Sequence, residues 1–228
     1  MSTTKRLMLL LIAVFLVGGF VAWPQSSDVP FRHWQAGIEA SFYGDMNFGL
    51  ELGLKYYPIR FVGIGAGVGF GGDIGELDEV TFEVGDMMVI ADDGDDVTWF
   101  SAGLQLQSPV LLRIGDGESQ LSLKADAGIR LPVPVDRRIG YSVVPNAPGT
   151  WEATTHRSER NRGGESCFLY FKPAVALDSH RCQMCVGYLW SNMDVYSGVR
   201  NVTVMGRHLD LPRRRPIHGL TLGFGYRF

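Results

Sequence analysis

Cysteine is scarce in this sequence of 228 residues, which has three: Cys167, Cys182 and Cys185. An odd number cannot all pair within one chain, so a closed framework of disulfides is excluded. On an extended strand, positions three residues apart lie about 10 Å from one another, which is too far for a Cys182–Cys185 disulfide. A metal site would need more ligands than the neighbouring His180. We interpret all three as ordinary small strand residues and expect neither a metal nor another cofactor.

Helical periodicity is lacking after Trp23, and the one long apolar run lies at the N-terminus. Lys5 and Arg6 precede an apolar stretch over 7–22 with small residues near its end, the pattern of a secretory signal peptide. A retained membrane helix is the alternative, because the run is barely shorter than the roughly 20 residues that span a bilayer. No stop-transfer segment follows it, and no cysteine follows to carry a lipid anchor. The sequence predicts a signal peptide at 1–22, cleaved after Ala22 or Gly19, and one domain at 23–228.

Glycine is abundant, with 29 residues, and aromatic and β-branched residues stand between the glycines. This composition is typical of strands and turns. Several segments alternate apolar with small or polar residues, which is the period of a strand with one apolar face. An even number of such segments suits an antiparallel barrel with both ends of the chain on one side. The eight segments cover residues 34–42, 47–56, 62–71, 99–114, 120–133, 166–177, 181–193 and 220–228.

The connections between these segments differ in length in a regular way. Short turns follow the second, fourth and sixth segments, whereas long segments at 72–98, 134–165 and 194–217 follow the third, fifth and seventh. Only the first connection, at Gly44 and Asp45, is short where a long one is expected. Short turns at one end and long loops at the other are typical of membrane barrels. The sequence therefore predicts an all-β fold, an eight-stranded antiparallel up-and-down transmembrane β-barrel.

The apolar rows could face lipid or a core, and a soluble eight-stranded barrel with apolar rows inside is the alternative. The apolar rows hold almost no charge, while the opposite rows are rich in glycine, most clearly in the five alternate glycines from Gly63 to Gly71. Small residues suit a narrow lumen better than a solvent face. Aromatic residues stand at the ends of the apolar rows, as in the girdles at the two lipid interfaces of membrane barrels. Both features favour a barrel whose apolar rows point outward, toward lipid.

Two stretches resemble a known family. The closing stretch GLTLGFGYRF, from Gly219 to Phe228, resembles the last strand of Gram-negative outer-membrane barrels. LQLQSPVLLR, from Leu104 to Arg113, is similar to a strand of the porin-like barrels common in Bacteroidetes. The resemblance implies the fold and a location in the outer membrane of a Gram-negative bacterium. In that family the barrel-assembly machinery reads an alternating last strand ending in Phe, so the resemblance also implies that Tyr226 and Phe228 form an assembly signal.

Deleting Phe228 is expected to impair assembly far more than function, because the deletion removes the end of this signal. The measurement is the yield of protein in the outer membrane, together with the heat-modifiable mobility of the folded barrel on gels. A deletion variant with normal yield and normal mobility would contradict the prediction.

The rows opposite the apolar ones hold charges of both signs. Eight strands leave a lumen barely wide enough for side chains, so these charges must pair or each incurs a desolvation cost of several kcal/mol. We interpret them as a lumen filled by ion pairs, with a narrow passive channel as the alternative. Their positions do not support general acid–base chemistry. The predicted network comprises Glu39, Glu51, Lys55, Arg113, Lys124, Asp126, Arg130, Lys172, Arg181 and Arg227.

The long loops are strongly charged. The first, from Asp73 to Asp96, holds ten acidic residues and no basic one, which predicts a solvated acidic loop with a hairpin over 80–90. Calcium binding is the alternative, although the spacing is not that of an EF-hand. The other two loops are rich in arginine, which binds phosphate, and Arg213, Arg214 and Arg215 are the predicted anion-binding rim for lipopolysaccharide. Attraction between acidic and basic loops predicts a loose lid.

Together these features predict a monomer with a structural or surface-interaction role. Its expected partners are outer-membrane lipid, lipopolysaccharide and the barrel-assembly machinery, and nucleic acid is not expected. Barrels that modify lipid A exist, so an enzyme is the third alternative. Of the five histidines, however, only His156 and His208 fall in outer loops, and Ser158 and Glu159 stand near His156 as loop residues often do by chance. The sequence favours a barrel that is not an enzyme.

Overall fold

The computed structural model describes residues 31–43, 47–73, 80–85, 87–91, 97–114, 119–133, 138–145, 155–160, 166–194, 203–208 and 216–228. The predicted signal peptide at 1–22 and the predicted rim at Arg213, Arg214 and Arg215 lie outside the described residues. In the described part of the chain, no helix combines the length and the apolar character needed to cross a membrane.

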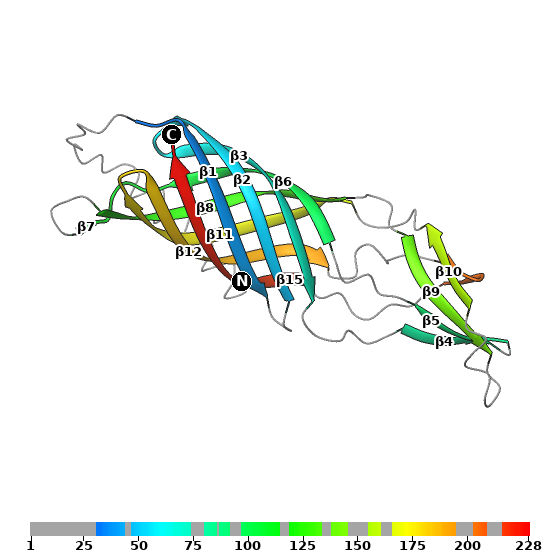
Figure 1. Cartoon of the computed structure of the whole chain (residues 1–228). Coiled ribbons are helices and arrows are strands. Elements are labelled where there is room, and N and C mark those ends of the chain that lie inside the picture. The colour runs from blue at the N-terminus through cyan, green and yellow to red at the C-terminus, as the bar shows by residue number, and fades with distance from the viewer. Residues whose placement is uncertain are drawn as a thin grey trace, which may run out of the picture.

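Eight antiparallel strands close into a barrel, which Figure 1 shows as a cylinder of tilted strands. Each long strand pairs with the next one along the chain, and the first pairs with the last, so the sheet closes on itself. The predicted eight-stranded antiparallel up-and-down barrel is therefore confirmed. Its strands are β1 (Trp34–Tyr43), β2 (Asn47–Ile59), β3 (Val62–Asp73), β6 (Val97–Gln107), β8 (Ser119–Val133), β11 (Phe168–Ser179), β12 (Cys182–Asp194) and β15 (Pro216–Arg227).

The strand predicted over 99–114 is interrupted. β6 ends at Gln107, and a separate short strand, β7 (Leu112–Ile114), resumes pairing with β8. Pro109 lies between them and has no N–H to donate. Because Gln107 lies opposite Lys124 and Leu112 opposite Leu121, residues 108–111 face only two residues of β8. The result is a bulge that carries β7 past the end of the barrel wall.

Two of the long loops join in a second sheet. Its strands are β4 (Val80–Val84), β5 (Met87–Ala91), β9 (Arg138–Pro145) and β10 (Thr155–Arg160), in the order β10-β9-β5-β4. The predicted hairpin over 80–90 is confirmed as β4 and β5. The pairing of β5 with β9, from Met87–Pro145 to Ala91–Tyr141, joins the two loops through their backbones. Figure 1 shows this sheet beyond the end of the barrel from which the loops leave.

We call that end of the barrel the loop end, and the opposite end, with the turns at Arg60–Phe61 and His180–Arg181, the turn end. The third long loop holds β13 (Thr203–Val204) and β14 (Arg207–His208), which pair with each other. Gly206 in the turn between them has a φ of 80°, a conformation that glycine adopts without steric cost.

The outside of the barrel is apolar. Leu52 is 60% exposed and Ile64 54%, whereas the alternate residues of the same strands face inward. Aromatic side chains gather at both ends: Trp34 packs on Tyr56 at the turn end, and Phe48 on Phe70 at the loop end. A soluble protein shows the reverse, with apolar rows inside and charged rows outside. The soluble alternative is therefore excluded, and the barrel is a transmembrane one.

Candidate functional site

One group of lumen charges lies near the loop end. Glu51 on β2 accepts hydrogen bonds from Trp99 Nε1 at 3.0 Å, Ser101 Oγ at 2.7 Å and Arg130 Nη2 at 3.0 Å. The Arg130 guanidinium also lies over the Trp99 ring, with Cζ 4.8 Å from the ring centroid. Arg130 is 2% exposed, so its charge is balanced by Glu51 rather than by solvent. β2 and β8 are not neighbours in the sheet, so this pair crosses the lumen.

A second group occupies the middle of the lumen. Asp126 Oδ2 on β8 lies 3.0 Å from Lys55 Nζ on β2 and 3.3 Å from Lys172 Nζ on β11. Lys172 also pairs with Glu39 on β1. β1 and β11 are not neighbours either, so this chain of alternating charges ties opposite walls together. Lys55 donates a further hydrogen bond to Gln105 Oε1 at 2.7 Å.

Near the turn end, amide side chains join the charges. Asp178 Oδ1 accepts hydrogen bonds from Gln183 Nε2 at 2.7 Å and lies 3.0 Å from Arg227 Nη2. Gln107 Nε2 donates to Asp178 Oδ2 at 3.0 Å. Lys124 Nζ donates to Gln183 Oε1 at 2.7 Å, and among the described residues it makes no ion pair. At this position the amide dipole of Gln183, instead of a carboxylate, stabilises the lysine charge.

Apolar side chains close the lumen at the loop end. Val97 and Trp99 on β6, Phe168 on β11 and Met193 on β12 form one buried cluster, and Ile217 on β15 packs against it. Each side chain in the cluster is at most 6% exposed. An apolar constriction of this kind resists filling with water. The cluster therefore separates the charged lumen from the space under the loops.

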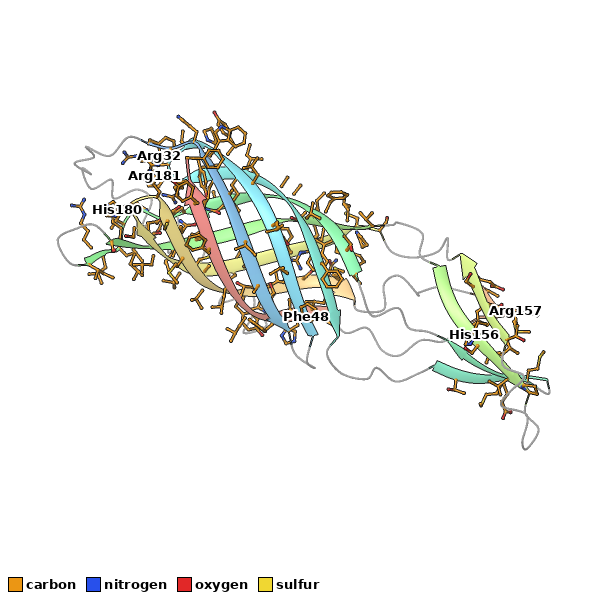
Figure 2. The ribbon with its side chains drawn as sticks, in the orientation of Figure 1. Arg32, Phe48, His156, Arg157, His180 and Arg181 are labelled. Carbon is orange, nitrogen blue, oxygen red and sulfur yellow. The ribbon has the colours of Figure 1, made fainter. Side chains whose placement is uncertain are left out.

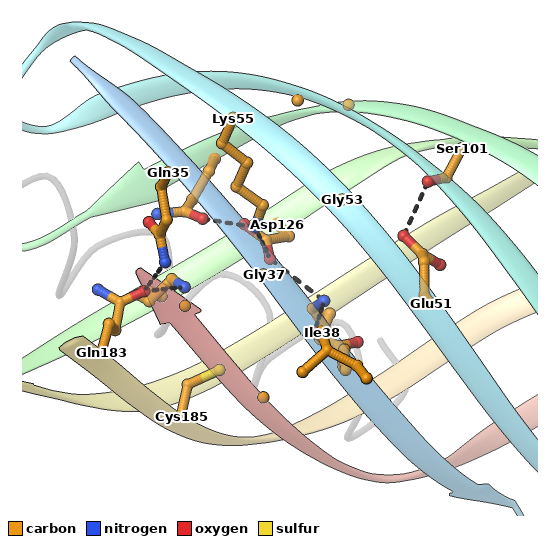
Figure 3. Close-up of a pocket in the computed structure, with 18 of the residues that line it drawn as sticks. Gln35, Gly37, Ile38, Glu51, Gly53, Lys55, Ser101, Asp126, Gln183 and Cys185 are labelled. Carbon is orange, nitrogen blue, oxygen red and sulfur yellow. Dashed lines mark hydrogen bonds and ion pairs between the residues drawn. The ribbon is translucent and has the colours of Figure 1, made fainter. Parts of the chain in front are cut away.

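A cavity of about 70 Å³ remains among the lumen charges, and Figure 3 shows Glu51, Lys55, Asp126 and Gln183 around it. Oε1 of Glu39 and Oδ1 of Asp126 are buried and accept no hydrogen bond from the protein. One water needs roughly 10–15 Å³ of such space, so the cavity has room for a few waters that can donate to these oxygens. This gap in the packed lumen is far smaller than a pocket for an organic ligand.

The alternate glycines of β3 leave the space that the lumen side chains fill. A Cβ placed on Gly63 would lie 2.9 Å from the Tyr57 ring, and one on Gly69 would lie 2.2 Å from Cε2 of Trp99. Glycine at these positions lets long side chains from β2 and β6 lie flat against the inner wall. The glycine row is therefore the complement of the polar and aromatic side chains on the neighbouring strands.

The structure places most of the predicted network inside the barrel, with two corrections. Arg113 is exposed: it lies on β7, beyond the bulge at 108–111, where β7 pairs with β8 and with no strand on its other edge. Arg181 is exposed, because alternation stops at its turn, and its Nη1 donates to the Tyr226 hydroxyl on the outside at 3.1 Å. The prediction is wrong for these two. Those that face the lumen are Glu39, Glu51, Lys55, Lys124, Asp126, Arg130, Lys172 and Arg227.

The residues of the predicted assembly signal point outward at the turn end. Tyr226 and Phe228 are both exposed, and the Phe228 N–H donates to the Trp34 carbonyl at 3.0 Å. Their assembly role stays a prediction. All three cysteines are free: Cys167 and Cys182 are exposed, and Cys185 is half-buried beside the lumen cavity. Among the described residues, no three His, Cys, Asp or Glu side chains are placed to hold a metal ion.

Several lumen residues were not predicted as part of the site. Asp178 falls between the predicted segments, in an expected turn, whereas β11 continues to Ser179 and the Asp178 carboxylate binds Arg227. Trp99 is buried in the lumen and binds Glu51, whereas the predicted network includes charged residues only. Asp178 and Trp99 each lie an even number of residues from other inward-facing residues of the same strand. This alternation is the signal that could have placed them in the lumen. The same parity identifies the four lumen glutamines, Gln35, Gln105, Gln107 and Gln183.

No protein-family model matches the chain, and no curated protein matches it in sequence. A designed transmembrane β-barrel aligns with a TM-score of 0.44 at 8% identity, over 89% of this chain and 100% of that one. The N-terminal β-barrel domain of Pseudomonas aeruginosa OprF aligns with a TM-score of 0.42 at 7% identity, over 86% and 98%. Neisserial surface protein A aligns with a TM-score of 0.41 at 10% identity, over 86% and 96%.

Proposed function

We propose that this chain is an outer-membrane β-barrel of a Gram-negative bacterium with a structural or surface-interaction role and no open pore. The observation that carries the proposal is the closed lumen. Ion pairs cross it at two levels, and an apolar cluster caps its loop end. A passive channel needs a continuous water path, whereas the cavity of about 70 Å³ has room for a few waters. The working surface is therefore outside the lumen.

The sheet built by the loops supplies such a surface. Val89, Tyr141, Val143 and Val144 are buried in it, so the sheet has a small core of its own. Figure 2 shows His156 and Arg157 on it, well away from the barrel wall. Both side chains are exposed, as are the neighbouring Thr155 and Ser158. A sheet with a core presents a more defined surface to an outside partner than an unpaired loop does.

The remaining partners belong to the same proposal. Lipopolysaccharide phosphates would bind the guanidinium groups of Arg213, Arg214 and Arg215, because planar guanidinium forks match phosphate oxygens. The barrel-assembly machinery would read Tyr226 and Phe228. The barrel closes within one chain, since β1 pairs with β15, so it needs no second copy to complete its wall. We therefore propose a monomer.

Conductance in planar lipid bilayers tests the closed lumen. The refolded protein is expected to produce no stepwise current, because the Glu51–Arg130 and Glu39–Lys172 pairs and the apolar cap all obstruct the axis. Flotation of the protein with liposomes and its heat-modifiable gel mobility serve as controls that it is inserted and folded. Regular current steps from inserted protein would instead establish the narrow passive channel.

A further inference from the structure

One basic residue of the lumen has no counter-ion. Between the apolar cluster and the turn end, each of the four described carboxylates is paired with a basic residue of its own. The pairs are Glu39–Lys172, Glu51–Arg130, Asp126–Lys55 and Asp178–Arg227. Lys124 is the fifth basic residue there, and no described carboxylate lies within ion-pair distance of its Nζ. The described lumen therefore carries one positive charge in excess.

The Lys124 ammonium lies deep in the barrel. Lys124 is 4% exposed, and its neighbours across the sheet, Gln107 on β6 and Ala174 on β11, are uncharged. An ammonium has three N–H donors. The described residues accept from one of them, through Gln183 Oε1 at 2.7 Å. A buried charge is costly unless it is paired and its donors are satisfied. The remaining donors and the unbalanced charge therefore favour an acceptor with a negative charge.

Other unused donors lie at the same place. Gln35 Nε2 donates to Gln183 Oε1 at 3.1 Å, so the Gln35 and Lys124 nitrogens meet at one oxygen. The second N–H of the Gln35 amide has no acceptor among the described residues. Cys185, two positions beyond Gln183 on the inward row of β12, adds a thiol, which is a weak donor. Three donor groups therefore border the cavity of about 70 Å³, and Figure 3 shows Gln35, Gln183 and Cys185 beside it.

We propose that this cavity binds a small monovalent anion of the halide class, such as chloride, against Lys124. The ammonium balances the charge of the anion, and the Gln35 amide and the Cys185 thiol complete the donor set. A single-atom anion needs little more space than a water, for which roughly 10–15 Å³ suffices, so the cavity accommodates the anion together with waters. Water alone would accept from the same donors but would leave the positive charge unbalanced.

Two carboxylate oxygens also border the cavity. Glu39 Oε1 and Asp126 Oδ1 are buried and accept no hydrogen bond from the protein. The charges of both carboxylates are already balanced, by Lys172 and Lys55. Waters that share the cavity would donate to these oxygens and separate them from the anion. The anion site goes beyond the proposed function, because it depends on the lumen charges and not on whether the lumen conducts.

The test is the urea midpoint of the barrel in lipid vesicles at constant ionic strength, with bromide exchanged for gluconate, an organic anion too large for the cavity. Raising bromide from about 1 mM to about 100 mM is expected to lower the unfolding constant of the wild type at least tenfold, because the ion binds only the folded form. Lys124→Met is expected to abolish this dependence. In gluconate the variant is expected to be no less stable than the wild type, because no carboxylate loses its partner.

Arg181→Met is the matched control, since it removes one positive charge from an exposed site, and it is expected to keep the wild-type dependence on bromide. Anomalous scattering from crystals grown in bromide locates the ion, which is expected within hydrogen-bond reach of Lys124 Nζ. This second measurement decides the matter if Lys124→Met does not fold. A wild-type midpoint that does not respond to bromide, an equal response in Lys124→Met, or anomalous peaks at the protein surface alone would overturn the proposal.

Discussion

Replacing Arg130 with Met is expected to lower the free energy of unfolding by about 3–5 kcal/mol. The substitution removes the positive partner of Glu51, whose carboxylate would then keep only the hydrogen bonds from Trp99 and Ser101. A buried charge without its counter-ion cannot recover its hydration energy inside a packed lumen. Arg130 also stacks on Trp99 and Tyr170, so its loss removes favourable cation–π contacts as well.

The measurement is the urea midpoint of the barrel in lipid vesicles, followed by the gel mobility of the folded form. Arg181→Met is the matched control: it removes the same group from an exposed site and is expected to change stability by less than about 0.5 kcal/mol. Adding Glu51→Met to Arg130→Met is expected to recover part of the loss, because an apolar pair leaves no buried charge. An unchanged midpoint for Arg130→Met would show that water reaches Glu51, and this would favour the channel.

Gly69→Ala is expected to destabilise the barrel by about 2–3 kcal/mol, although it adds a single methyl group. The new Cβ would lie 2.2 Å from Cε2 and 2.3 Å from Nε1 of Trp99. The indole cannot simply move aside, since it is held by Glu51, by the Arg130 guanidinium and by the apolar cluster at the loop end. The overlap must therefore strain the lumen packing or separate β3 from β6.

Gly53→Ala on β2 provides the control for this second prediction. A Cβ on Gly53 would meet the Ala66 carbonyl oxygen at 3.5 Å, which is ordinary contact, so a change of less than about 0.5 kcal/mol is expected. Both variants are measured by the same urea titration. Trp99→Leu in the Gly69→Ala background should cost less than Trp99→Leu alone, because the smaller side chain relieves the overlap. Equal effects of Gly69→Ala and Gly53→Ala would show that Trp99 does not occupy the space above Gly69.

The strands and the inward rows could be predicted because the side-chain period of a strand is two, whatever surrounds it. That period placed Glu39, Lys55 and Asp126 in the lumen before any contact was known. It does not reveal which inward residues meet, because Glu39 and Lys172 lie on strands that are not neighbours. Their meeting depends on the tilt and stagger of the whole barrel.

The period also fails where a strand stops being regular. Arg181 follows the end of β11, and a turn residue has no assigned face, so its side chain is free to lie against Tyr226 on the outside. Arg113 keeps its parity but lies beyond a bulge that Pro109 alone did not predict. The loop sheet joins Val89 to Val143, residues far apart in the chain. Local alternation holds no information on such a pairing, which depends on both loops meeting above the barrel.

Because β5 pairs with β9, the two surface loops that hold these strands depend on each other. A change of sequence in one loop, engineered or natural, therefore has to remain compatible with the other. Exchanging residues 87–91 without 141–145 would break a ladder that both loops need, so grafts have to carry both segments together. The loop between β12 and β15 pairs within itself, through β13 and β14. A foreign peptide inserted at Gly206, in the turn of that short hairpin, would therefore be displayed without disturbing the shared sheet.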